Sequence, residues 1–285
     1  MKIHFTKMHG IGNDYIYINC LEGIPFDPHV LSKAMSPRHF SVGADGVVLI
    51  CASDVADAKM RMFNLDGSEG KMCGNAIRCV GKYLYEKAIV TKETMTIETL
   101  SGIKTLQLHV KNGVVETVSV NMGFASFEPQ DIPVLKAQPM INETITVKTA
   151  DGNVTVPMTA VSMGNPHAVC YVDNPETLEL SKIGPVFENL GIFPERVNTE
   201  FVRVADKNTL NMRVWERGSG ETYACGTGAC AVAAASVKNG ICDKDQDITV
   251  HLIGGDLTVR VSENYEITMT GKAAFVYEGV YNYED

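Results

Sequence analysis

Two segments of the chain carry hydrophobic residues at helical spacing, each directly after a cysteine-glycine step. In residues 73–88, Ile77, Val80 and Leu84 recur at intervals of three and four positions, which predicts a helix. Residues 225–240 are small and apolar on nearly every face, so we expect a helix that is buried all round. An Asn-Gly stop signal marks the end of this second helix.

Alternating hydrophobic and polar positions predict β-hairpins after both helices and before the second. Three pairs of alternating runs are joined by short turns that contain glycine, at residues 105–120, 145–158 and 248–261. A buried helix among hairpins is typical of a sheet that curls around it. We therefore predict an α+β fold in which a curled β-sheet or barrel surrounds a central helix, once in each half of the chain.

The chain repeats its own pattern at a shift of 152 positions. The coincident positions are Asn13 and Asn165, Asn64 and Glu216, Cys73 and Cys225, Gly102 and Gly254, and Asn112 and Asn264. A period of this length indicates two copies of one domain rather than a solenoid of short units. We predict two pseudo-symmetric domains, residues 1–124 joined by a C-terminal strand at 272–285, and residues 125–271.

Composition narrows the class of protein but not its chemistry. The 285 residues carry a net charge of −9, which argues against broad binding to nucleic acid or anionic membranes. The N-terminus lacks the apolar region of a signal peptide, and no apolar run approaches the roughly 18 residues of a membrane span. We expect a cytoplasmic protein with free thiols, no nucleic-acid or membrane partner and, because no C-x-x-C pair occurs, no metal site.

Cys73 and Cys225 each stand where a helix is predicted to begin. The first N–H groups of a helix lack partners within it, and the helix dipole makes this end positive. A thiol at such a position ionises more easily. The same free N–H groups can bind a ligand carboxylate, and the glycines beside each cysteine allow a close approach.

A duplicated thiol points to stereoinversion at a carbon atom. If the two domains pack about a pseudo-twofold axis, one ligand would lie between two acid/base groups, one on each face. A hydrolase would need one nucleophile and a histidine base instead. We find neither a phosphate loop ending in Lys-Ser/Thr nor an assignable cofactor lysine, so we expect no cofactor. Hydrogen bonds and helix dipoles would then stabilise the carbanion.

Five stretches of the chain resemble the diaminopimelate epimerase family over nearly its whole length. They are KMHGIGNDY, MFNLDGSEGKMCGNAIRC, MGNPHAV, VNTEFV and WERGSGETYACGTGACA, in the order of that family. The resemblance implies a cofactor-independent isomerase that interconverts LL- and meso-2,6-diaminopimelate, an amino-acid substrate of lysine biosynthesis. It also implies a cytoplasmic homodimer whose site lies at the cleft between two similar halves.

The resemblance also assigns roles to residues. It makes Cys73 and Cys225 the two acid/base thiols, and His167 and Glu216 the groups that adjust their pKa values. The substrate contacts that it implies are Asn13, Asn64, Asn165, Asn198, Glu216 and Arg217, with carboxylate-binding helix starts at Gly74, Asn75, Gly226 and Thr227. Many family members have glutamine where this chain has Gly46. Backbone or water would replace that contact.

Other functions share some of these features. Proline and hydroxyproline racemases carry a similar second cysteine motif, but MCGNAIRC differs from their Cys-Gly-His step. A non-catalytic amino-acid-binding protein, or a redox switch that pairs the two thiols, is the alternative from another class. Tyr277 lies in a strand-like C-terminal segment that fits either a dimer contact or a closing strand within the chain.

Overall fold

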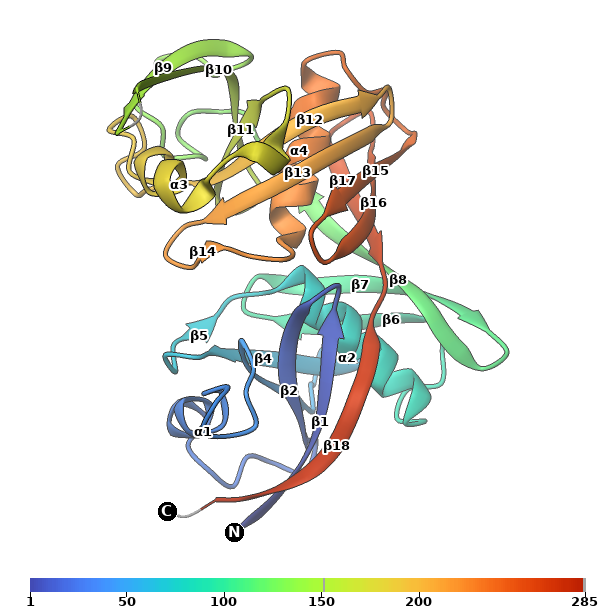
Figure 1. The fold of residues 1–285 in the computed structure, drawn as a ribbon. Coiled ribbons are helices and arrows are strands. Elements are labelled where there is room, and N and C mark those ends of the chain that lie inside the picture. The colour runs from blue at the N-terminus through green and yellow to red at the C-terminus, as the bar shows by residue number, and fades with distance from the viewer. Residues whose placement is uncertain (151, 284–285) are drawn as a thin grey trace. The chain divides into compact units, whose positions relative to one another are not determined.

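The computed structural model describes residues 1–150 and 152–283 (Figure 1). Contacts divide the chain into two compact units, Met1–Val120 with Thr270–Asp285, and Asn121–Met269. Asp151 of the predicted 145–158 hairpin turn, and the last two residues of the predicted C-terminal strand, lie outside the described residues. The boundaries that the sequence suggests at residues 124 and 272 remain predictions.

The first unit is a curled sheet around helix α2. Its elements are β1 (Lys2–Gly10), β2 (Asn13–Cys20), α1 (Pro28–Met35), β3 (Gly46–Cys51), β4 (Ala58–Asn64), β5 (Glu69–Gly70), α2 (Gly74–Glu86), β6 (Thr94–Thr99), β7 (Gly102–Lys111), most of β8 (Val114–Phe124) and β18 (Ala274–Asn282). The strands run in the order β18-β1-β2-β3-β4-β6-β7-β8. Helix α2 contacts β1 and β2 near one end of this strand order and β7 near the other end. The sheet therefore wraps around the helix.

The second unit repeats this plan around helix α4. Its elements are β9 (Glu143–Thr149), β10 (Gly152–Ser162), β11 (Pro166–Tyr171), the 3-10 turn η1 (Pro175–Thr177), α3 (Leu180–Glu188), β12 (Asn198–Asp206), β13 (Thr209–Glu216), β14 (Gly220–Glu221), α4 (Gly226–Lys238), β15 (Asp247–Leu252), β16 (Gly255–Val261) and most of β17 (Glu266–Gly271). The strand order is β9-β10-β11-β12-β13-β15-β16. Helix α4 contacts β10, β11, β12, β15 and β16. The predicted α+β class, with a curled sheet around a helix in each half, is confirmed.

Strand registers carry the 152-residue repeat. In the parallel pair β2–β3, Ile16 lies opposite Val47, and in β11–β12, Ala168 lies opposite Thr199. The antiparallel pairs β3–β4 and β12–β13 keep the same offset. The sequence pairs Gly102 with Gly254, but the structure shifts this equivalence by one residue. Strand β7 begins at Gly102, and the corresponding strand β16 begins at Gly255.

Both central helices are almost wholly buried. Ala231 and Ala235 of α4 are fully buried, as are the residues between them, so the prediction of a helix buried all round is confirmed. In α2 even the charged side chain of Arg78 has no exposed surface. Among the residues the structure describes, no helix is both long and apolar enough to cross a membrane.

Candidate active site

Cys73 is the N-cap residue of α2, as the sequence predicts for a helix start. Its backbone is extended, with φ −133° and ψ 121°, and its carbonyl accepts the first helical bond, from the Ile77 amide, at 3.0 Å. The half-buried thiol makes no capping bond and instead donates from Sγ to Asn13 Oδ1 at 3.4 Å. The sulfur therefore lies at the positive end of the helix, beside a residue that the sequence also assigns to the site.

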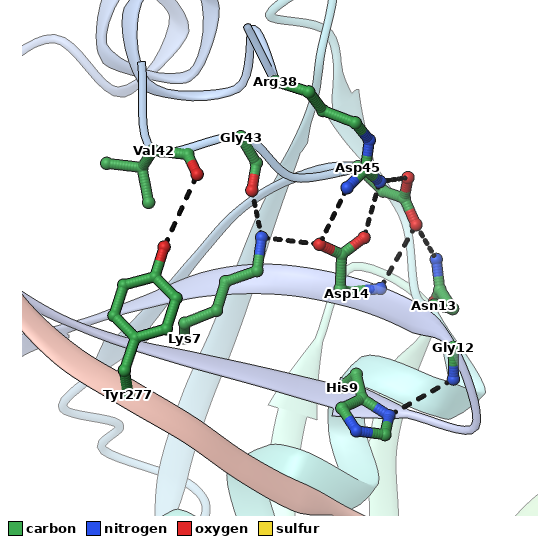
Figure 2. A network of polar contacts seen from close by, with 10 residues as sticks. All are labelled: Lys7, His9, Gly12, Asn13, Asp14, Arg38, Val42, Gly43, Asp45 and Tyr277. Carbon is green, nitrogen blue, oxygen red and sulfur yellow. Dashed lines mark hydrogen bonds and ion pairs between the residues drawn. The ribbon is translucent and has the colours of Figure 1, made fainter.

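A strained turn presents Asn13. The hairpin between β1 and β2 turns on Ile11 and Gly12, at φ values of +46° and +89°. A positive φ is common for glycine but costly for a β-branched residue such as isoleucine. His9 Nδ1 accepts the Gly12 amide at 3.2 Å and so helps to hold the turn (Figure 2). Strain of this kind is characteristic of functional sites.

The other predicted residues of the first unit have structural partners of their own. Asn64 ends β4, and its Nδ2 donates to Ser68 Oγ at 2.9 Å. Gly46 pairs with Asn64 across β3 and β4, and a Cβ added at Gly46 would collide with the Phe63 carbonyl oxygen. The glycine is therefore required by the close approach of β4, which explains why no longer side chain stands there.

Gly74 and Asn75 form the first turn of α2 over a buried cation. The Arg78 guanidinium donates from Nη1 to the Gly74 carbonyl and from Nη2 to Asn75 Oδ1, both at 2.9 Å. Sequence reasoning assigned no role to Arg78. The sequence signal for Arg78 is its spacing: it follows Gly74 by four residues and Asn75 by three, and residues at these spacings lie on the same face of a helix.

Cys225 is the N-cap residue of α4, but its sulfur has different partners. Sγ accepts a hydrogen bond from the Gly228 amide at 3.3 Å and lies 3.6 Å from Thr227 Oγ1. Burial raises the pKa of this thiol well above its usual value, and the charges of Glu216 and Glu200 raise it further. The bonds from Thr227 and Gly228 act in the opposite direction but do not outweigh burial, so the expectation that a thiol at this helix start ionises more easily is wrong for Cys225.

A hydrogen-bonded chain leads from this thiol to a buried carboxylate. Asn165 Nδ2 lies 3.4 Å from Thr227 Oγ1, and Asn165 Oδ1 lies 3.0 Å from His167 Nε2. His167 Nδ1 lies 2.7 Å from Glu200 Oε1, and both of these side chains are fully buried. The chain brings three predicted residues, Asn165, His167 and Thr227, to Cys225.

Glu200 is a member of the site that sequence reasoning missed. Its Oε2 is buried and has no hydrogen-bond partner among the described residues. The available signal was a single glutamate in the strand-like stretch VNTEFV, where a carboxylate on a buried strand needs a partner.

The remaining predicted residues stand at the ends of β12 and β13. Asn198 is 5% exposed, and its amide bridges two backbone segments, donating to the Pro166 carbonyl at 2.8 Å and accepting the Arg217 amide at 2.9 Å. The Arg217 guanidinium donates to the Glu195 carbonyl at 2.9 Å. Asn198 thus fixes the start of β12 against the segment that follows β13.

Glu216, at the end of β13, is linked to Cys225. Burial raises the pKa of its carboxyl, although hydrogen bonds from Thr222 and Cys225 and the charge of His167 act to lower it. A carboxyl next to a buried thiol is the kind of group that adjusts proton transfer. Within the described residues, no His, Cys, Asp and Glu side chains group closely enough to hold a metal ion.

Known proteins match almost the whole chain. The family model described as diaminopimelate epimerase matches residues 5–128 and 159–276. A diaminopimelate epimerase of Methanococcus maripaludis is 54% identical over 277 residues, which cover 96% of this chain and 98% of the relative. Those of Acetivibrio thermocellus and Bacillus cytotoxicus are 52% and 48% identical, over 97% and 99% of this chain and 98% of each relative.

Solved structures of lower identity share the fold. A phenazine biosynthesis protein of Bacillus anthracis has a TM-score of 0.73 at 18% identity and covers 99% of this chain and 100% of its own. A hydroxyproline epimerase of Agrobacterium vitis, solved with bound trans-4-hydroxy-L-proline, has a TM-score of 0.69 at 16% identity, covering 98% of this chain and 92% of its own. At these identities the likeness establishes the architecture alone.

Proposed function

Because the chain belongs to the diaminopimelate epimerase family, we propose that it interconverts LL- and meso-2,6-diaminopimelate by a two-thiol proton transfer that needs no cofactor. The observation that carries the proposal is the matched placement of Cys73 and Cys225. Each is the N-cap residue of the central helix in its unit, and each is followed by a glycine. Membership of the family makes the protein an amino-acid epimerase, and hence an isomerase.

The proposed reaction transfers protons between the two cysteine sulfurs and the substrate α-carbon. A thiolate takes the α-proton and becomes a thiol, while the electron pair of the broken C–H bond stays with the substrate as a carbanion. The second thiol then protonates the opposite face of that carbon and becomes a thiolate. The two sulfurs exchange protonation states in each turnover, so the enzyme serves both directions of the equilibrium.

The helix starts supply the stabilisation that a cofactor would otherwise provide. In the proposed complex the substrate α-carboxylate accepts N–H bonds from Gly74 and Asn75 of α2 and from Gly226 and Thr227 of α4. Negative charge that develops at the α-carbon spreads into this carboxylate and is held by the positive helix ends. Arg78, buried behind Asn75, adds a fixed positive charge to that end of α2.

Selection of the substrate needs polar groups for its second amino-acid end. The side chains proposed for substrate contacts are Asn13, Asn64, Asn165, Asn198, Glu216 and Arg217. Amides both donate and accept hydrogen bonds, and a guanidinium can bind a carboxylate through two parallel bonds. Proline has no such second end, and the relatives near 50% identity are diaminopimelate epimerases, so the racemase alternative is disfavoured. A homodimer in the cytoplasm completes the proposal.

Single cysteine variants test the mechanism. We expect Cys73→Ala and Cys225→Ala each to lose at least about 100-fold in kcat for epimerisation, because each removes one of the two proton-transfer groups. Each variant should retain exchange of the α-hydrogen with deuterated solvent for one stereoisomer, since one thiol remains. The measurement is epimerisation by chiral chromatography alongside deuterium incorporation by mass spectrometry.

Cys79→Ala serves as the matched control, because Cys79 lies on the same helix as Cys73 but is fully buried. Wild-type epimerisation in either catalytic variant would refute the two-thiol mechanism. Rapid conversion of proline, with none of diaminopimelate, would refute the proposed substrate.

A further inference from the structure

The side-chain amide of Asn13 carries an oxygen that accepts hydrogen bonds and a nitrogen that donates them. The neighbours of Asn13 decide which of the two atoms faces Cys73. Asp45, in the loop before β3, lies with Oδ2 at 2.7 Å from Asn13 Nδ2 (Figure 2). An ionised carboxylate only accepts hydrogen bonds, so it must face the amide nitrogen of Asn13 and not the oxygen. The opposite end of the amide, Oδ1, is therefore left for Cys73, and Sγ donates to it at 3.4 Å.

A network of charges fixes Asp45 itself. Arg38 Nη2 donates to Asp45 Oδ1 at 2.7 Å, and the Asp14 amide donates to Asp45 Oδ2 at 3.2 Å (Figure 2). The Asp45 amide in turn donates to the Asp14 carbonyl at 2.9 Å. Both carboxylate oxygens are thus engaged, and the side chain cannot turn without breaking several bonds.

The network extends to a buried lysine. Arg38 binds Asp14 through two nitrogens, at 2.6 and 3.1 Å, and Lys7 Nζ lies 2.5 Å from the same carboxylate. Lys7 also donates to the Gly43 carbonyl, which ties the loop before Asp45 to β1 (Figure 2). Burial acts to raise the pKa of Asp14, but the bonds from Arg38 and Lys7 outweigh it and keep this pKa below its usual value.

We propose that Asp45 is a positioning residue: it turns the amide of Asn13 so that the carbonyl oxygen faces Cys73 and holds that sulfur as a protonated thiol in the free enzyme. The S–H group can donate to this oxygen, whereas a thiolate would face its lone pairs. The reversed amide would offer N–H groups and favour the thiolate. The role rests on the proposed acid/base function of Cys73.

Comparison of the two repeats shows that an aspartate orients the site asparagine in the first unit only. The position 152 residues after Asp45 is Val197, which cannot orient an amide. In the second unit, Asn165 is oriented by His167 instead, and the residue that matches His167 in the first unit is Tyr15. The two equivalent asparagines are thus set by unrelated groups, so their orientation is not a by-product of the shared fold.

The test is the pH dependence of Cys73 alkylation in Asp45→Asn. The new amide can donate as well as accept, so Asn13 is free to turn its NH₂ toward the sulfur. We expect the pH of half-maximal alkylation rate to fall by about one unit. Iodoacetamide labelling is followed by mass spectrometry of the tryptic peptide 72–78, in which Cys73 is the sole cysteine.

Asp57→Asn is the matched control, because Asp57 is a carboxylate of the same unit that accepts from Thr96 and Lys92. An unchanged or higher midpoint in folded Asp45→Asn would overturn the proposal. If that variant does not fold, Arg38→Gln decides: a lower midpoint supports the role of Asp45, and an unchanged one overturns it. Alkylation needs no substrate, so a missing epimerase activity would count against the proposed function alone.

Discussion

At the scale of single residues, the same Cys-Gly step gives two thiols with different hydrogen bonds. Cys73 donates from its sulfur to the carbonyl oxygen of Asn13, whereas the Cys225 sulfur accepts the amide of Gly228. The Cys-Gly steps predict two equivalent helix starts, and both cysteines are indeed N-cap residues. The Cys225 sulfur caps its own helix, whereas the Cys73 sulfur bonds to a side chain of another strand, β2, which sequence spacing cannot place beside it.

The effect of one such neighbour can be measured. We expect Glu200→Gln to lower the pKa of Cys225, because the Glu200 charge adds to burial and to Glu216 in raising it. Burial persists in the variant, so the pKa should stay above the usual value for cysteine. The measurement is the pH profile of alkylation, with fragment ions to separate Cys225 from Cys230 on the same tryptic peptide.

Glu188→Gln is the control for that experiment, because Glu188 is also a buried glutamate of the second unit but bonds to Trp215 and Arg196. Equal alkylation profiles for Glu200→Gln, Glu188→Gln and the wild type would show that the Glu200 charge does not act on Cys225.

Several site residues were out of reach of sequence reasoning for a common physical reason. Asp45, Arg78 and Glu200 act through buried or partly buried polar contacts, and a charged residue in a sequence is by default read as exposed. The repeat did identify Asn13 and Asn165, because these positions recur at the same spacing as the cysteines.

At the scale of elements, the position of β13 depends on how α3 packs beneath it. Gly184 of α3 lies against the ring of Trp215, one residue before Glu216. Trp215 Nε1 donates to Glu188 Oε2 at 2.8 Å, so the indole is held from the same helix. The hairpins and central helices were predictable from periodicity, but this contact between a helix and a strand's end was not, since it depends on the absence of a side chain.

A methyl group at Gly184 should be poorly tolerated. Because the added Cβ would overlap the Trp215 ring, we expect Gly184→Ala to lower the free energy of unfolding by about 1–3 kcal/mol. The displaced ring should also change the intrinsic fluorescence, since Trp215 is the single tryptophan of the chain. Urea unfolding monitored by fluorescence measures both effects.

Gly191→Ala provides the comparison, because a Cβ at Gly191 would meet no atom within 4 Å. If the two alanine variants unfold at the same urea concentration, the close packing of α3 against Trp215 does not require glycine at position 184.

At the scale of the whole molecule, the ends of the chain meet in one sheet. Strand β18 runs antiparallel to β1, with Asn282 opposite Lys2 and Ala274 opposite His9 (Figure 1). Rings reinforce the pairing, since Tyr277 of β18 packs edge-on against Phe5 of β1. The first unit is therefore completed by a strand that follows the whole second unit in the sequence, so its sheet depends on a pairing of very high sequence separation.

Removal of residues 272–285 should therefore affect the two units unequally. Without β18, the edge of β1 loses its hydrogen-bonded partner, and the Lys272 carbonyl no longer accepts from Arg78. We expect amide hydrogen exchange to become rapid in β1 and β2, whereas α4 and β11–β13 keep their protection because their partners all lie within the second unit.

Val280→Thr, at a half-exposed side chain of β18, should leave the exchange pattern unchanged because it keeps the strand's backbone. Persistent protection of β1 in the truncated protein would mean that the first unit is stable without its final strand, and loss of protection in α4 would mean that the second unit depends on the first.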